Sequence, residues 1–191
     1  VVSIYESDES QLKATIEPLA FEIDQASGAL AKAANEQIVT EIESLTTQAG
    51  GDWGAMITAG DFSNRNPLND LVDAITTITD NNFRPDTITL HPRVISDYLS
   101  NTYIHASTRP DDRVFSGKVE MPKLPTVNAV VDVGFTSTVA TIFDSKTMLL
   151  GEGPTVAEQF RDPFRAADGY VIRQFLQPLK TTNDAGRKIT G

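Results

Sequence analysis

The chain has 191 residues, of which 40% are hydrophobic and 22% are charged, and its net charge is −10. This composition supports a folded core in one domain or two closely packed lobes, and it excludes an intrinsically disordered chain. The apolar stretches reach only strand length, which excludes a membrane-spanning helix, and the absence of cysteine excludes disulfides, thiolate metal sites and cysteine nucleophiles.

The charge is carried by an unusual mixture of side chains. Sixteen of the 26 acidic residues are aspartate, and only seven residues are lysine. A dense acidic surface with little lysine stays soluble in concentrated salt, where its self-repulsion is screened. The composition raises a halophilic origin as a hypothesis, beside the simpler interpretation of an ordinary acidic protein. Because the basic residues are scattered, a nucleic-acid-binding module is disfavoured.

The first third of the chain predicts a strand, a long helix and a linker. Residues 14–23 alternate imperfectly, as in a β-strand, and Pro18 suits an edge or protruding strand because it lacks a backbone donor. Apolar residues at steps of three and four predict a helix over residues 25–45. Ser27 is the expected N-cap of this helix. Residues 51–66 read as a turn-rich linker.

The remaining elements mix helices and strands. A helix is predicted over residues 67–79, and a buried strand at 85–92 is followed at once by a helix at 93–99. Residues 181–191 read as a polar tail. Further strands are predicted at 127–133, 139–143, 155–160 and 170–179. Because the elements do not alternate strictly, the pattern favours an α+β fold over a doubly wound α/β fold.

No metal, phosphate or nucleophile motif is complete. His91 and His105 lack an accompanying cysteine or close carboxylate pattern, so a structural turn position is the expected role of His91. Gly151 and Gly153 lack a third glycine and predict a turn. We therefore expect neither a metal nor a cofactor.

Pairs of carboxylates leave one enzymatic alternative open. Asp70 and Asp73 share a predicted helix, and Asp111 and Asp112 are adjacent in a predicted loop. A soluble α+β hydrolase or transferase could use such acidic pairs. However, chance pairs are expected in so acidic a chain, and catalytic carboxylates need burial to tune their pKa values. The predicted function is accordingly not enzymatic.

Residues 158–165 alternate charges with two phenylalanines. A strand with this pattern has one apolar face and presents Arg161 and Arg165 on the other. One interpretation is a solvated face with a surface ion pair of small energetic value. The other is a subunit contact, where arginine is favoured because its planar fork makes bidentate pairs.

The succession of elements from residue 14 to residue 179 resembles the major capsid proteins of tailed phages and tailed archaeal viruses. Their fold is the Hong Kong phage 97 fold, which encapsulins share. The resemblance implies a protein that self-assembles into pentamers and hexamers of an icosahedral shell around a double-stranded DNA genome. It would lie in the virion after assembly in the host cytoplasm. An encapsulin-type nanocompartment shell is the alternative. The segments that carry the resemblance are 85–92, 93–99, 117–132, 140–144, 158–165 and 170–177.

The resemblance also implies a domain organisation. Residues 1–24 would belong to an extended loop, and residues 25–66 to a peripheral domain with a spine helix and linker. Residues 67–153 would form the axial domain, and residues 154–191 the return strands of the peripheral domain and the C-terminal tail. Because members of the family usually have a longer N-terminal arm, we expect this chain, which begins with valine, to be clipped.

Its implied partners are other copies of the chain, together with scaffold, portal and minor capsid or cement proteins. Packaged DNA would be held without sequence specificity, and no membrane would be involved. The candidate subunit-interface residues are Lys13, Glu17, Asp111, Asp112, Arg113, Arg161, Asp162 and Arg165.

Overall fold

A computed structural model describes residues 2–7, 18–59, 65–105, 119–120, 127–164 and 167–190. The chain divides into two compact units. Unit 1 consists of Val1–Ile38 and Leu150–Leu179, and unit 2 consists of Val39–Leu149 and Lys180–Gly191. Three elements, α2, β7 and β10, continue from one unit into the other.

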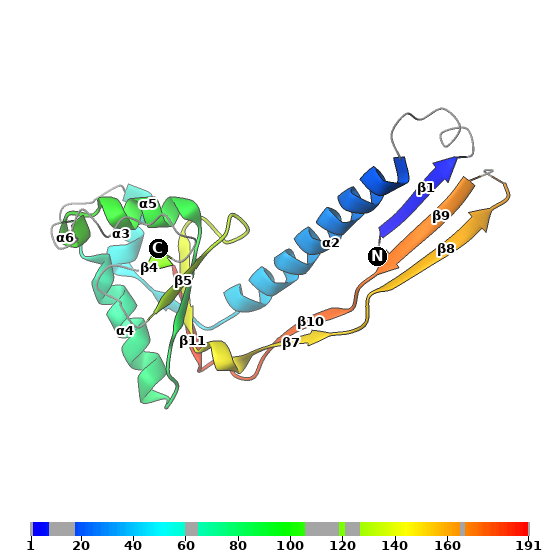
Figure 1. The fold of residues 1–191 in the computed structure, drawn as a ribbon. Helices are drawn as coiled ribbons and strands as arrows, with labels where there is room; N and C mark the ends of the chain where they lie inside the picture. Colours follow the sequence, from blue (N-terminus) through cyan, green and yellow to red (C-terminus); the bar gives the residue numbers. More distant parts are fainter. Residues whose placement is uncertain are drawn as a thin grey trace. The chain divides into compact units, whose positions relative to one another are not determined.

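Unit 1 combines one long helix with narrow antiparallel β-structure. Its three-stranded sheet has the order β1-β9-β8, so that β1 and β8 form the two edges (Figure 1). Strands β7 and β10 pair separately as a two-stranded ribbon. The elements are β1 (Val2–Ser7), α2 (Pro18–Glu43), β7 (Met148–Glu152), β8 (Val156–Asp162), β9 (Ala167–Arg173) and β10 (Leu176–Lys180).

The N-terminal part of this unit differs from the sequence-based expectation. Residues 18–23 are helical and not a strand, because Pro18 is the first residue of α2, where its fixed φ suits a helix and its missing donor costs nothing. Ser27 is not an N-cap, since it lies inside the helix and its hydroxyl donates to the carbonyl of Ile23 at 2.9 Å. The helix therefore begins seven residues before the predicted start and covers 26 residues.

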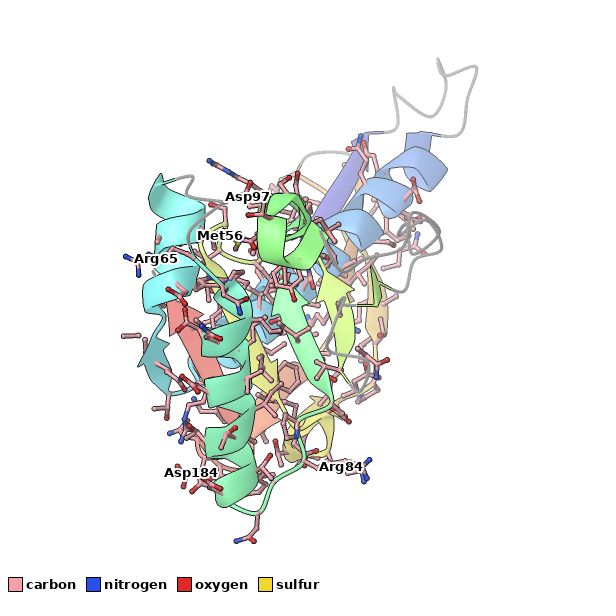
Figure 2. The ribbon with its side chains drawn as sticks, turned by 90° about the vertical axis from the view of Figure 1, so that its left-hand side faces the viewer. Met56, Arg65, Arg84, Asp97 and Asp184 are labelled. Carbon is pink, nitrogen blue, oxygen red and sulfur yellow. The ribbon has the colours of Figure 1, made fainter. Side chains whose placement is uncertain are left out.

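Unit 2 contains a six-stranded mixed sheet with the order β2-β11-β6-β3-β5-β4. Helices α4 and α5 lie in front of this sheet in Figure 2. Helix α4 contacts β11 and β6, and α3 contacts β11. The strands are β2 (Thr47–Ala49), β3 (Thr87–Leu90), β4 (Val119–Glu120), β5 (Asn128–Val131), β6 (Val139–Phe143) and β11 (Gly186–Thr190). The helices are α3 (Gly51–Ala59), α4 (Pro67–Asp80), α5 (Pro92–Ser100), α6 (Thr102–His105) and the 3-10 turn η1 (Ser145–Thr147).

The hydrophobic core lies between the helices and the sheet of unit 2. The apolar faces of α3, α4 and α5 meet the buried side chains of β3, β6 and β11. The bulkiest fully buried members are Trp53, Met56, Leu71, Ile78, Ile88, Leu90, Val94, Tyr98, Ile104, Ile142 and Ile189. Burial raises the pKa of Tyr98, which stays neutral within this core.

Elements with strong local signals form as predicted. Helix α4 begins at Pro67 after the N-cap Asn66, whose side chain accepts from the Leu68 amide. His91 has the predicted structural role, since its Nδ1 accepts from the Arg93 amide at 3.1 Å and caps α5. Strand β6 has the predicted bounds.

Other predicted elements are wrong. The linker at 51–66 contains helix α3, because Trp53 and its apolar neighbours pack into the core. The polar tail at 181–191 contains β11, which gains backbone partners on both sides. Gly151 lies in strand β7 and not in a turn. The strand at 170–179 is broken at Gln174 and Phe175 into β9 and β10.

Asp86 ties the start of β3 to the turn after β6. Its Oδ2 accepts from the Ser145 hydroxyl at 2.7 Å, and its Oδ1 accepts from the Ser145 amide at 2.9 Å and from the Thr87 hydroxyl at 2.9 Å. Partial burial of the Asp86 carboxyl group raises its pKa. The hydrogen bonds to the carboxylate lower the pKa by more than burial raises it, so the pKa lies below its usual value of 3.8.

The depressed pKa of Asp86 gives a pH-dependent prediction. The unfolded state binds the proton more tightly, so the contribution to stability is present above about pH 4 and is lost as the pH falls through the folded-state pKa. Ser145→Ala removes one donor and should cost about 1 kcal/mol at pH 7. The cost should shrink at pH 3, as measured by urea unfolding at both pH values. An equal cost at both would show that the charge of Asp86 is not involved.

Candidate assembly surface

Among the side chains of unit 1 that the structure describes, few apolar ones are buried. Among the hydrophobic residues that the structure describes as buried, only Ala26 and Ala167 belong to this unit, and both are small. Large hydrophobic side chains are instead exposed on it, namely Ile23, Leu150, Phe160, Phe164, Phe175 and Leu179. Large exposed apolar side chains of this kind are candidates for contact with another protein surface.

Charged side chains pair across the hairpin of β8 and β9. Arg161 lies directly opposite Asp168, and its guanidinium is 3.2 Å from the carboxylate. Arg173 reaches Glu158 diagonally at 3.4 Å. Because these groups are largely exposed, each pair contributes about 0–1 kcal/mol. The predicted surface ion pair is therefore present, and a subunit contact of Arg161 remains a prediction.

The hairpin tip presents one fully exposed aromatic side chain. Phe164 is 99% exposed. Its amide donates to Oδ1 of Asp162 at 3.0 Å, which forms a local turn around Pro163. The turn orders the backbone that carries Phe164, so the phenyl ring projects from a defined position.

A groove lies at the other end of the same β-structure and is lined by residues of α2, β7 and β10. Its volume is about 550 Å³. The apolar part of the lining comes from Leu30, Ala33, Ala34, Phe175 and Leu176, and Glu152 is the one charged residue in it. Gln37, Gln174 and Gln177 also line the groove, which is therefore about as polar as apolar. A concave surface of this size can hold an aromatic side chain against its apolar part.

Most of the residues predicted from the sequence as interface candidates lie outside the described residues. These are Lys13, Glu17, Asp111, Asp112, Arg113 and Arg165. Arg161 and Asp162 are described, and they occupy successive positions at the end of β8, beside the hairpin tip. Sequence reasoning missed the groove and the exposure of Phe164. The aromatic residue after Asp162 and Pro163, a turn-forming pair, was the available signal for the latter.

One residue of the enzymatic alternative, Asp70, has a structural role in unit 2. Its Oδ2 accepts from the Trp53 amide at 2.6 Å and caps α3, so it ties α4 to α3. Burial raises the pKa of Asp70, while the hydrogen bond from Trp53 opposes the shift. Asp73 is exposed on the outer side of α4. Asp52 of α3 pairs with Arg65, which lies just before α4, at 3.5 Å.

The described parts of the chain contain neither a candidate metal site nor a candidate membrane-spanning helix. No cluster of three or more histidine or acidic side chains there could hold a metal ion. Likewise, none of the helices in these parts is long and apolar enough to cross a membrane.

Comparison with known proteins gives no match by sequence but clear matches by structure. No family profile and no curated protein matches the chain. A structure from Mycobacterium phage Che8 is similar with a TM-score of 0.70 at 12% identity, over 98% of this chain and 68% of that one. The capsid of cyanophage P-SCSP1u is similar with a TM-score of 0.64 at 12% identity, over 99% of this chain and 70% of that one.

A shell protein of a different kind is also similar. The encapsulin SrpI complex of Synechococcus elongatus PCC 7942 has a TM-score of 0.64 at 9% identity, over 99% of this chain and 71% of the encapsulin. At such low identity the similarity concerns the fold. With its long helix, its narrow β-structure and its separate helix-covered sheet, this chain has the Hong Kong phage 97-type fold found in phage capsid proteins and encapsulins.

Proposed function

We propose that this chain is the major capsid protein of a tailed virus, and that it self-assembles into pentamers and hexamers of an icosahedral shell around double-stranded DNA. The observation that carries the proposal is that the described side chains of unit 1 include only two buried hydrophobic ones, both alanine, beside several large exposed ones. The shared fold with a phage capsid and an encapsulin supports it.

The physical argument concerns how unit 1 is stabilised. A sheet of three strands needs an apolar face packed on something to be stable by itself. A helix likewise draws most of its stability from tertiary packing of one face. Unit 1 exposes phenylalanine and leucine side chains on both its strands and its connections. Closed symmetric association would bury these side chains and complete the missing core.

The two units then correspond to the two domains of the fold. We assign unit 1, with α2 as the spine helix, to the peripheral domain, and unit 2 to the axial domain around the symmetry axes. Scaffold, portal and cement proteins would be further partners, and the shell would lie in the virion. A net charge of −10 suits a DNA container, because a lumen that held duplex tightly would hinder packing and release.

An encapsulin-type shell is the second candidate, favoured by the similarity to the encapsulin of Synechococcus elongatus. The contents of particles purified from the native source separate the two functions. Packaged double-stranded DNA supports the capsid, whereas an enclosed protein cargo without a genome supports the nanocompartment. Both candidates are structural proteins that need no catalytic residue.

The decisive experiment is the mass of the purified protein in solution. We expect megadalton hollow particles, or pentamers and hexamers, by light scattering and negative-stain microscopy. Measurement in low and in molar salt adds a test of the halophilic hypothesis, since a strongly acidic subunit should assemble better where its self-repulsion is screened. A monomer in every condition would overturn the proposed function.

A further inference from the structure

The hairpin tip of unit 1 carries an aromatic side chain without a neighbour. Phe164 is 99% exposed on a backbone that Asp162 holds through a hydrogen bond of 3.0 Å. A fully solvated phenyl ring on a hydrogen-bonded turn has two properties of an interface anchor, since it offers a large apolar area and its backbone loses little entropy on binding.

The groove of unit 1 is the matching concave surface. Phe175, which is 61% exposed, forms one wall, and Ala33 and Ala34 of α2 lie on another. The Gly153 amide donates to the carbonyl of Phe175 at 2.8 Å, and a Cβ on Gly153 would lie only 2.8 Å from the Cβ of Phe175. The absence of a side chain at Gly153 therefore allows the ribbon to hold Phe175 in place along the groove.

The tip and the groove lie at opposite ends of the hairpin of β8 and β9. The pair Asp162 and Ala167 is next to the tip, whereas the pair Val156 and Arg173 is next to the groove. Strand β8 has seven residues, which corresponds to roughly 23 Å at about 3.3 Å per residue. A copy of the chain therefore cannot place its own Phe164 in its own groove. Complementary surfaces at opposite ends of one body give head-to-tail contacts, which form a ring where the rotation between copies closes and a filament where it does not.

Charge complementarity indicates the occupant of the groove. Its one charged lining residue is Glu152, whose side chain is exposed. Arg165 follows Phe164 directly in the sequence and carries the opposite charge. We propose that Phe164 of one copy inserts into the groove beside Phe175 of a second copy. This contact deepens the proposed shell function and rests on it, since it names one surface through which the subunits associate.

The contact can be tested by crosslinking, because the chain contains no cysteine and introduced thiols are unique. Pro163→Cys, which is exposed and leaves Phe164 intact, and Ala33→Cys are placed in separate copies, which are mixed, assembled and treated with a short bis-maleimide. We expect covalent dimers from the mixture, and a ladder of higher species when both substitutions are in one chain. Val133→Cys replaces Pro163→Cys in the control, since Val133 is 78% exposed in unit 2, and should give no ladder.

A second measurement follows the strength of association. Phe164→Ser should lower the association constant by roughly tenfold or more, as expected for an aromatic anchor. Phe164→Leu should restore most of it, and Val133→Ser should leave it unchanged. The melting temperature of the unassembled subunit should be the same for all three variants, because the side chains of Phe164 and Val133 are exposed to solvent in the single subunit.

The outcomes separate the contact from the function. The contact would be overturned, and the shell function left standing, if Phe164→Ser forms particles normally and the cysteine variants yield no ladder. A wild-type chain that remains monomeric in every condition would overturn both. A ladder together with weakened assembly of Phe164→Ser would establish the contact.

Discussion

A chain that ends at Lys180 is expected to lose the folded structure of unit 2. The truncation removes β11, which pairs in parallel with β2 over three residues and antiparallel with β6 over five. It also removes Ile189, which is fully buried in the core. Loss of one such side chain alone costs about 2–5 kcal/mol, and domains are stable by only about 5–15 kcal/mol. The remaining strands would keep unpaired backbone groups on both sides of the gap.

Circular dichroism and urea unfolding of the truncated and full chains check this prediction. Ile189→Ala is the graded variant and should destabilise the full chain by about 2–5 kcal/mol. Asp184→Ala is the matched control nearby, since Asp184 is exposed, and should change the free energy of unfolding by less than about 0.5 kcal/mol. If the truncated chain unfolds cooperatively at the same urea concentration as the full chain, β11 is not required for the stability of unit 2.

Replacing Trp53 with alanine is expected to destabilise unit 2 by about 3–5 kcal/mol. The indole is fully buried among residues of α4, α5 and the sheet. Its Nε1 donates to the carbonyl of Thr138 at 3.3 Å, which joins α3 to the loop before β6. The substitution removes the bulkiest side chain of the core and leaves a cavity together with an unpaired carbonyl.

Urea unfolding followed by circular dichroism measures this loss. Trp53→Phe keeps most of the apolar packing and removes the indole donor, so its cost should be smaller than that of the alanine variant. Val72→Ala, on the exposed side of α4, should be nearly neutral. Since Trp53 is the only tryptophan, wild-type fluorescence adds an independent check. Emission typical of a solvated indole in the native protein would show that α3 is not packed in the core.

Elements whose signals are local were predicted well from the sequence. Asn66 and Pro67 mark the start of α4 through capping chemistry, and the apolar stripe of that helix follows a 3.6-residue period. His91 and Pro92 likewise mark the boundary between β3 and α5. These signals depend only on neighbours along the chain, so they can be recognised without knowledge of the fold.

Elements that depend on distant partners were predicted wrongly. Residues 186–190 have no strand-like pattern, and β11 exists because β2 and β6 pair with it from both sides. Helix α3 has two glycines and an aspartate in its first four residues, a weak helix signal. It is stabilised by burial of Trp53 and by the capping carboxylate of Asp70, 17 residues further along the chain.

The same division applies to the candidate site. The sequence indicates a charged strand at 158–165, whereas in the structure β8 ends at Asp162 and a turn follows at Pro163 and Phe164; Arg161 of β8 pairs with Asp168. The groove could not be predicted, because its walls come from α2 and from two strands more than a hundred residues away. The exposure of Phe164 depends on its place at the tip of a hairpin, which is known only once β8 and β9 are paired.

The sequence by itself determined the α+β class, the order of the main elements and, through them, the resemblance to capsid proteins. These properties follow from side-chain periodicity and from caps and turns, which act over a few residues. The tertiary structure decided which weak segments join the six-stranded sheet and which of the described apolar side chains of unit 1 stay exposed. Those properties depend on which distant residues meet, because backbone pairing and burial are shared between segments that the sequence keeps far apart.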